Sequence, residues 1–145
     1  MKSVLKFVAA GLVLALSVVP VLTVSAADGK SPIAGGYCPV AYAKMGKAVK
    51  GDAKFSSEIE GQTYYSSSAE AKKMFEAQPG MFKIAYHGLC ATGVAMGKKL
   101  VSNPEIFTVY QGTTYLFSSA EAKAMFDKDP AMTVSKADAG WTKLQ

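Results

Sequence analysis

The stretch EGQTYYSSSAEAKKMFEAQP, at residues 60–79, occurs almost unchanged a second time as QGTTYLFSSAEAKAMFDKDP at residues 111–130. Shifted by 51 positions, the two stretches agree at 12 of 20 residues, far more than chance would give. The two cysteines extend the agreement upstream, because Cys38 corresponds to Cys90 at a shift of 52. The chain therefore contains an internal duplication, and every special residue can be compared with its counterpart.

The first copy predicts a strand, a turn, a second strand and a helix. Residues 54–59 alternate loosely and the run Thr63-Tyr-Tyr65 is rich in aromatic residues, as strands on either side of a glycine turn would be. Ser67 and Glu70 form a Ser-x-x-Glu capping box, in which hydroxyl and carboxylate each satisfy a free backbone N–H. We therefore expect a helix that is capped by Ser67 and stopped by Pro79.

The second copy predicts the same elements in the same order. Its strands are expected at residues 106–110 and 114–117, and its helix between a cap at Ser118 with Glu121 and a stop at Pro130. A short hairpin with one helix cannot bury its apolar face alone. The sequence thus predicts an α+β fold, in which two pseudo-symmetric strand–strand–helix halves pack as one compact domain.

The residues expected to fill the core are aromatic and methionine side chains of the repeats: Tyr64, Phe75, Phe117, Phe126, Met74 and Met125. Met74 and Met125 could also serve as thioether ligands of copper. Their helical spacing and the usual behaviour of methionine favour core packing instead.

The first 27 residues resemble a secretory signal. A basic start is followed by an apolar stretch that ends in small residues, which suits a cleavage site better than a retained membrane anchor. We expect residues 1–27 to be removed and the protein to be periplasmic or secreted. Residues 28–145 would then form a single domain of two repeats, at about residues 36–82 and 88–133.

The charged residues argue against a nucleic-acid partner. The chain has 16 basic residues, all of them lysine, against 11 acidic ones. Arginine supplies the planar guanidinium fork that recognises bases and phosphates, and none is present. The lysines are scattered, so we interpret them as a solvated surface.

Two cysteines in an exported chain suggest a disulfide between Cys38 and Cys90, which would close a loop of about 50 residues. Two separate buried thiols are a further alternative. The segment from Cys38 to Tyr42 predicts a short helix with proline in its first turn, and the segment that follows Cys90 is its counterpart. His87, the only histidine, lies three residues before Cys90.

The order of these motifs is similar to that of YHS-domain proteins, in their exported tandem form. The resemblance rests on GYCPVAY at residues 36–42, GKAVKG at 46–51, and the repeated tyrosine and Ser-x-x-Glu patterns. Tyr86-x-Gly-x-Cys90 and Ala137-Asp-x-x-Trp141 extend it, so that it covers nearly all of residues 28–145.

The resemblance implies binding of a soft transition metal, copper or zinc. Metal-binding relatives carry further cysteines where this chain has serine or alanine: Ser67, Ala71, Ser118 and Ala122. A four-ligand zinc site within one half is therefore impossible. The resemblance leaves a site shared between the halves, with Cys38, Cys90 and His87 as ligands.

We expect no enzymatic activity. The sequence has no Cys-x-x-Cys pair for dithiol exchange, and a nucleophilic pair of Cys90 with His87 is the one enzyme hypothesis it offers. The partner is then a metal ion or a protein still to be identified, with no membrane contact after signal cleavage. The alternative to metal binding is a structural or interaction module held by a Cys38–Cys90 disulfide.

Overall fold

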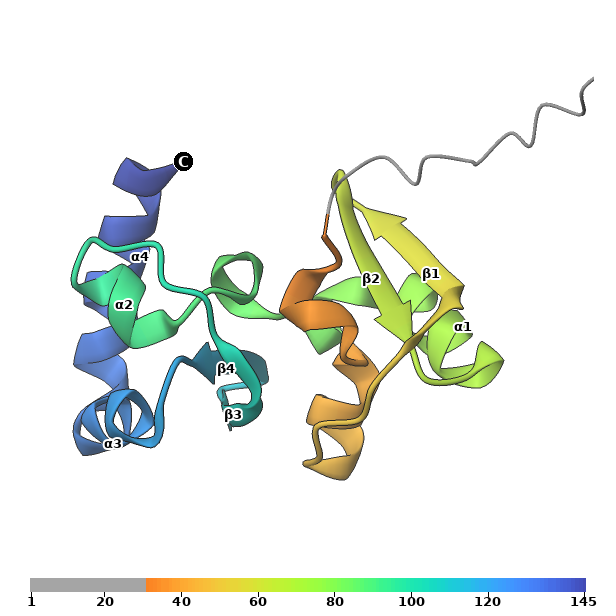
Figure 1. Cartoon of the computed structure of the whole chain (residues 1–145), viewed down its shortest axis with the longest axis horizontal. Helices are drawn as coiled ribbons and strands as arrows, with labels where there is room; N and C mark the ends of the chain where they lie inside the picture. Colours follow the sequence, from red (N-terminus) through yellow and green to blue (C-terminus); the bar gives the residue numbers. More distant parts are fainter. Residues whose placement is uncertain (1–30) are drawn as a thin grey trace, which may run out of the picture.

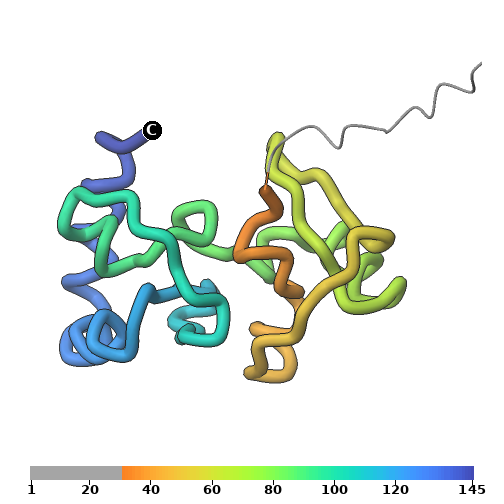
Figure 2. The backbone as a smooth tube through the Cα atoms, in the orientation of Figure 1, coloured from red at the N-terminus to blue at the C-terminus, as the bar shows by residue number. Residues whose placement is uncertain are grey.

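The computed structural model describes residues 31–145, so the signal expected at residues 1–27 lies outside the described residues. Figure 1 shows two halves side by side along the long axis of the molecule, and Figure 2 follows the backbone through them. The first half runs from residue 31 to 82 and the second from residue 83 to 145. Among the described residues, no helix is long and apolar enough to cross a membrane.

Each half contains one antiparallel hairpin. In the first half β1 (Asp52–Ile59) pairs with β2 (Gln62–Ser66), and in the second β3 (Asn103–Tyr110) pairs with β4 (Thr113–Phe117). Every residue pair in one register has its counterpart in the other at a shift of 51, including the irregularity near the start of the hairpin. The predicted α+β class and the common topology of the two copies are confirmed.

The conformation of the hairpin turns explains part of the agreement between the two strand registers. Both central residues of each turn have positive φ: 51° and 73° at Glu60 and Gly61, 48° and 76° at Gln111 and Gly112. Two left-handed residues give the turn whose twist matches that of the flanking strands, and glycine takes the second position without steric cost.

The helix that follows each hairpin begins one residue later than predicted. Ser68 caps α1 (Ala69–Ala77) by accepting a hydrogen bond from the Ala71 amide at 3.1 Å. Ser119 caps α3 (Ala120–Lys128) in the same way. The prediction that Ser67 and Ser118 are the caps is wrong, because the adjacent serine in each copy takes this role and moves the glutamate out of the capping-box position.

The two halves continue differently after this helix. Pro79 opens a short 3₁₀ turn, η3 (Pro79–Phe82), whereas Pro130 opens the fifteen-residue helix α4 (Pro130–Leu144). Asp129 caps α4 through the Met132 amide at 3.0 Å. Proline thus stops one helix and starts the next, because its missing N–H and fixed φ suit a first helical turn.

Three clusters of buried side chains form the core. One lies in each half, around Phe75 and Phe126, and the third joins the halves through Ile33, Tyr42 and Leu116. At this junction the Tyr42 hydroxyl donates to the Pro104 carbonyl at 2.6 Å, and burial raises the pKa of Tyr42. Contacts of both halves to one buried cluster hold them together.

The prediction that Met74 and Met125 belong to the core is wrong. Both side chains are exposed, whereas the predicted aromatic core residues Phe75, Phe117 and Phe126 are buried. Each methionine precedes its buried phenylalanine by one residue, which turns its side chain by about 100° on the helix. A nine-residue helix on a hairpin has one buried face, and the phenylalanine occupies it.

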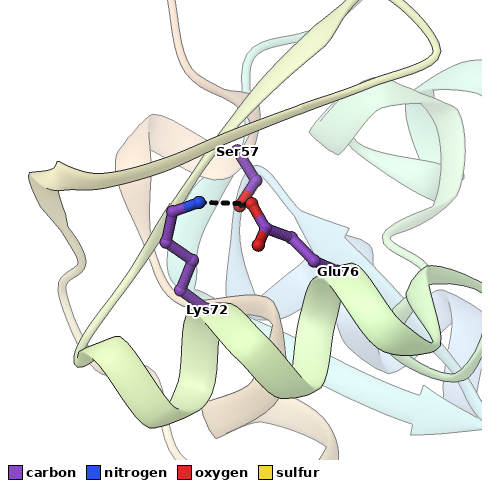
Figure 3. A network of polar contacts seen from close by, with 3 residues as sticks. All are labelled: Ser57, Lys72 and Glu76. Atoms are coloured by element: carbon purple, nitrogen blue, oxygen red, sulfur yellow. Dashed lines mark hydrogen bonds and ion pairs between the residues drawn. The ribbon is translucent and has the colours of Figure 1, made fainter.

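A small polar network ties the first hairpin to its helix (Figure 3). Glu76 on α1 accepts a hydrogen bond from the Ser57 hydroxyl of β1 at 3.0 Å and pairs with Lys72 one turn earlier. The bond from Lys72, followed by that from Ser57, lowers the pKa of Glu76. In the second half Asp127 pairs with Lys123 at 2.6 Å, and Thr108 stands where Ser57 would be.

Candidate functional site

Cys38 and Cys90 occupy equivalent places, each in the core of its own half. The Cys38 amide donates to the Val49 carbonyl at 2.8 Å, and the Cys90 amide to the Leu100 carbonyl at 2.9 Å. Both residues have 0% exposure, they belong to different core clusters, and both thiols are free. Of the alternatives for these cysteines, the structure has two separate buried thiols and no Cys38–Cys90 disulfide.

Each thiol has a serine as its partner. The Ser67 hydroxyl donates to Cys38 Sγ at 3.5 Å, and the Ser118 hydroxyl donates to Cys90 Sγ at 3.4 Å. Cys90 Sγ also accepts from the Gly93 amide at 3.4 Å, as the cap of the short helix α2 (Ala91–Ala95). The serines that sequence analysis assigned to helix caps therefore hold the two sulfurs in place.

The residues present do not fit a transition metal shared between the halves. Within residues 31–145, no three His, Cys, Asp or Glu side chains gather as a metal-binding group. Cys38 and Cys90 are enclosed in separate clusters, and His87 is on the surface with its ring 4.9 Å from that of Trp141. The structure thus does not unite Cys38, Cys90 and His87 as one ligand set.

His87 lies in a strained turn, η4 (Ala85–Gly88). Tyr86 and His87 have φ of 53° and 52°, a left-handed conformation that costs an L-residue roughly 1–2 kcal/mol. Their counterparts in η1 (Ile33–Gly36) have the same conformation but are Ala34 and Gly35. Two bulky residues kept in a costly conformation are typical of functional positions.

The two left-handed turns touch each other at the junction of the halves. A Cβ atom added to Gly88 would lie 2.8 Å from the Ala34 amide nitrogen, closer than real Cβ contacts allow. Since η4 is fixed against η1 in this way, the side chains of Tyr86 and His87 are placed beside the first half.

A cleft of about 510 Å³ opens between the halves at this point. The first half supplies the end of its hairpin and the side chains of Tyr64 and Phe75, and the second supplies η4, the start of β4 and the last turns of α4. Its aromatic lining comprises Tyr64, Phe75, Phe82, Tyr86, Tyr115 and Trp141. Clefts of this size with aromatic walls are the usual form of small-molecule sites.

The charged side chains of the cleft are few. Asp138 on α4 accepts a hydrogen bond from the Tyr86 hydroxyl at 2.9 Å. Burial, reinforced by this bond and by the carboxylate charge, raises the pKa of Tyr86; burial and the Asp138 charge also raise that of Tyr115. Glu60 and Lys83 are the other charged residues of the lining, so the formal charge with neutral His87 is −1.

Helix α4 brings its two cleft residues, Asp138 and Trp141, onto the same side as η4. The Trp141 ring lies 4.9 Å from His87 and 5.9 Å from Tyr86, centre to centre. The helix is held against α2 by close packing, because a Cβ atom at Gly140 would lie 2.3 Å from the Val94 carbonyl oxygen. The only tryptophan and the only histidine of the chain thus meet in one wall of the cleft.

No family model, curated protein or solved structure matched the chain. The resemblance to YHS-domain proteins therefore stays a prediction.

Of the cleft residues, only His87 was predicted as a site residue; Asp138 and Trp141 were part of the family resemblance without a predicted role, and the helix that carries them was not predicted. Two signals were present: Asp129-Pro130 is a cap followed by a first-turn proline, and apolar residues recur at helical spacing along the segment. These recurring residues are Val134, Ala137, Trp141 and Leu144, and all four pack into the core of the second half.

Proposed function

We propose that this chain is an exported, non-enzymatic binding protein that takes a small planar aromatic molecule carrying a protonated amine in the cleft between its halves. The observation that carries the proposal is the wall made by His87, Trp141 and the Asp138–Tyr86 pair. Flat aromatic faces favour a flat ligand, and they also attract a cation. Export rests on the signal expected at residues 1–27.

The charge of the lining supports an amine over an acid. The Asp138 carboxylate has one oxygen bonded to Tyr86, and a carboxylate has acceptor capacity for further donors. A ligand ammonium at this carboxylate would lie beside Trp141, which follows one helical turn later on α4, whereas the Tyr86 ring itself is buried. The surroundings of Cys90 support a binding role over a catalytic one, because its sulfur is enclosed and bonded to Ser118 and Gly93 rather than presented to the cleft.

The proposal is tested with three probes of similar size and different charge: phenethylamine, 2-phenylethanol and 3-phenylpropanoate. Amide and indole signals of ¹⁵N-labelled protein report where each probe binds. We expect phenethylamine to bind most tightly, with a Kd of about 1 mM or below, and to shift the signals of His87, Asp138 and Trp141. Tightest binding of the acid, or shifts confined to another surface, would contradict the proposal.

Two variants locate the interaction. Asp138→Asn should weaken phenethylamine binding about fivefold, the factor for roughly 1 kcal/mol, and should leave 2-phenylethanol nearly unaffected. Trp141→Leu should weaken all three probes. Asp127→Asn is the matched control, because it removes a carboxylate that faces Lys123 outside the cleft. Equal effects of the two Asp→Asn changes would argue against a role for Asp138.

A further inference from the structure

The methionines of the described residues are all on the surface. The chain has seven, and the six within residues 31–145 are Met45, Met74, Met81, Met96, Met125 and Met132. Their exposed fractions are 58%, 40%, 53%, 58%, 53% and 53%, in that order. Methionine is usually buried, and its flexible side chain is suited to filling gaps in a core. Six exposed methionines in a small domain therefore require a reason.

The six form three pairs at the shift of the duplication. Met45 corresponds to Met96, and 45 + 51 = 96. In the same way Met74 corresponds to Met125, and Met81 to Met132. Single exposed apolar residues are normal on protein surfaces. Here the same residue type stands at the same three exposed places in both halves, although most surface positions of the repeats differ.

The three positions of each half lie on elements that pack together. In the first half Met45 ends η2 (Ala41–Met45), and η3, which carries Met81, packs on both η2 and α1. Met74 and Met81 line one hollow of about 210 Å³. Lys44, the neighbour of Met45, lines it as well.

The second half repeats this arrangement, with the long helix α4 in place of the short η3. Met96 is the C-terminal cap of α2, Met125 is on α3 and Met132 is in the first turn of α4. Helix α4 packs on α2 and on α3, and the Thr92 hydroxyl of α2 donates to the Ala122 carbonyl of α3 at 2.7 Å. The three methionines thus lie on a group of three mutually packed helices.

We propose that each half carries a thioether site for a soft monovalent cation, Cu(I) or Ag(I). The trios are Met45, Met74 and Met81 in the first half, and Met96, Met125 and Met132 in the second. Thioether sulfur is a soft, neutral ligand that selects Cu(I), whereas Zn²⁺ prefers thiolate, imidazole and carboxylate. Three flexible side chains on adjoining elements can turn their sulfurs to one ion, since methionine has three rotatable bonds.

This inference is independent of the proposed cleft function, because no methionine lines the cleft. It also differs from a site built on Cys38, Cys90 and His87. The thiols are enclosed in the two cores, while the thioethers are on the surface and within reach of an ion in solution.

The surroundings predict that the second site binds more tightly. Besides its methionines, the hollow of the first half is lined by Lys44, Ala77, Gln78 and Phe82, with a formal charge of +1. Their counterparts at a shift of 51 are Ala95, Lys128, Asp129 and Thr133, and 1 − 1 gives a charge of 0. A cation is repelled less at the second trio.

The experiment is a titration with Ag(I), which has the charge and softness of Cu(I) and does not change oxidation state. The full exported protein is labelled with ¹³C in its methionine methyl groups, and the methyl signals are followed by NMR. We expect two equivalents to bind, with shifts of all six surface methionines and saturation of the second trio first. Competition with a chromophoric Cu(I) chelator then checks that Cu(I) binds with the same stoichiometry.

Leucine variants test the sulfurs without removing apolar volume. The triple change Met45→Leu, Met74→Leu and Met81→Leu should lower the stoichiometry from two to one, and the corresponding change of the second trio should do the same. Such near volume-conserving changes cost little stability, which a melting curve verifies. Cys38→Ser with Cys90→Ser, and separately His87→Ala, are the controls and should leave both equivalents in place.

Several outcomes would overturn the inference. Unchanged stoichiometry in the leucine variants would show that the thioethers are not the ligands, and loss of Ag(I) in the cysteine variant would assign the ion to the thiols. A wild type whose methionine signals do not shift with Ag(I) would leave the trios as apolar surface for a protein partner. Phenethylamine binding to the leucine variants should be unchanged, because no methionine lines the cleft, and this separates the test of the trios from that of the cleft.

Discussion

The first and second halves share one backbone arrangement, but the side chains packed around it differ. Phe75 and Phe126 are buried counterparts on α1 and α3, yet Phe75 has one aromatic neighbour, Tyr64, at 4.9 Å. Phe126 contacts three rings, those of Tyr110, Tyr115 and Phe117. The first-half counterparts of these three are Ile59, Tyr64 and Ser66. The core of the second half therefore has more aromatic contacts.

The comparison separates features of the fold from features of the site. The hairpin register, the helix caps and the serine–cysteine pairs occur in both halves, and each is explained by local backbone and hydrogen-bonding needs. The second half's wall of the cleft, in contrast, carries residues that have no equivalent in the first half. Tyr86 and His87 replace Ala34 and Gly35, and α4 replaces η3.

The largest expected difference concerns the two core phenylalanines. Phe→Ala changes in cores typically cost 3–5 kcal/mol, and each aromatic pair contributes about 0.5–1.5 kcal/mol beyond buried area. We expect Phe126→Ala to lower the free energy of unfolding by about 5 kcal/mol and Phe75→Ala by about 3 kcal/mol. Urea unfolding followed by circular dichroism measures both.

Leucine at the same positions is the control, because it keeps most of the volume and removes the ring. The difference between the halves should persist in Phe126→Leu and Phe75→Leu, though with smaller values. If Phe75→Ala proved the more costly, the two cores would not differ as their ring contacts indicate.

The sequence was enough to predict the fold of the two repeats, but of the cleft residues it predicted only His87 as part of a site. The repeats predicted both hairpins and both helices, because turn glycines, strand alternation and proline stops are local signals. The choice between Ser67 and Ser68 was not decided by the sequence, since both serines can cap and the thiol that engages Ser67 is 29 residues away. The cleft depends on how η4 meets α4 and the first hairpin, and such long-range contacts leave no periodic pattern.

The helix caps provide a test with a smaller expected effect, which distinguishes the capping serine of each half from the serine that precedes it. Ser68→Ala and Ser119→Ala should each lower the free energy of unfolding by about 1 kcal/mol, because the Ala71 and Ala122 amides lose their acceptors. Thermal unfolding measures these losses.

The neighbouring serines should behave differently. Ser67→Ala and Ser118→Ala remove the donors to the two sulfurs and should raise the rate at which a small thiol reagent modifies Cys38 and Cys90 in the native state. Equal reactivity in the cap variants and in these variants would show that the hydroxyls do not restrain the thiols.

The left-handed turns η1 and η4 allow a further comparison, in which glycine is removed from one turn and introduced into the other. Gly35→Ala should cost about 1 kcal/mol, because its φ of 60° is strained for any residue with a Cβ atom. His87→Gly should cost less, since relief of the same strain offsets the lost contact with Trp141. If His87→Gly also weakens phenethylamine binding while stability is kept, the strain at His87 serves the cleft; unchanged binding would make the turn a purely structural feature.

The smallest expected effect is a pH dependence at Glu76. Bonds from Lys72 and Ser57 lower the pKa of this carboxyl from its ordinary value of 4.5, so the folded state favours the charged form. The resulting stability is present above pH 4.5 and is lost as the pH falls through the lowered pKa of the folded state. Glu76→Gln should therefore reduce the melting temperature slightly at pH 7 and progressively less in acid.

Asp127→Asn is the matched change in the second half, where Lys123 is the partner and no serine stands opposite, and it should cost less at pH 7. A Glu76→Gln effect that stays constant from pH 7 down to strong acid would show that the network in Figure 3 does not contribute through the charge of Glu76.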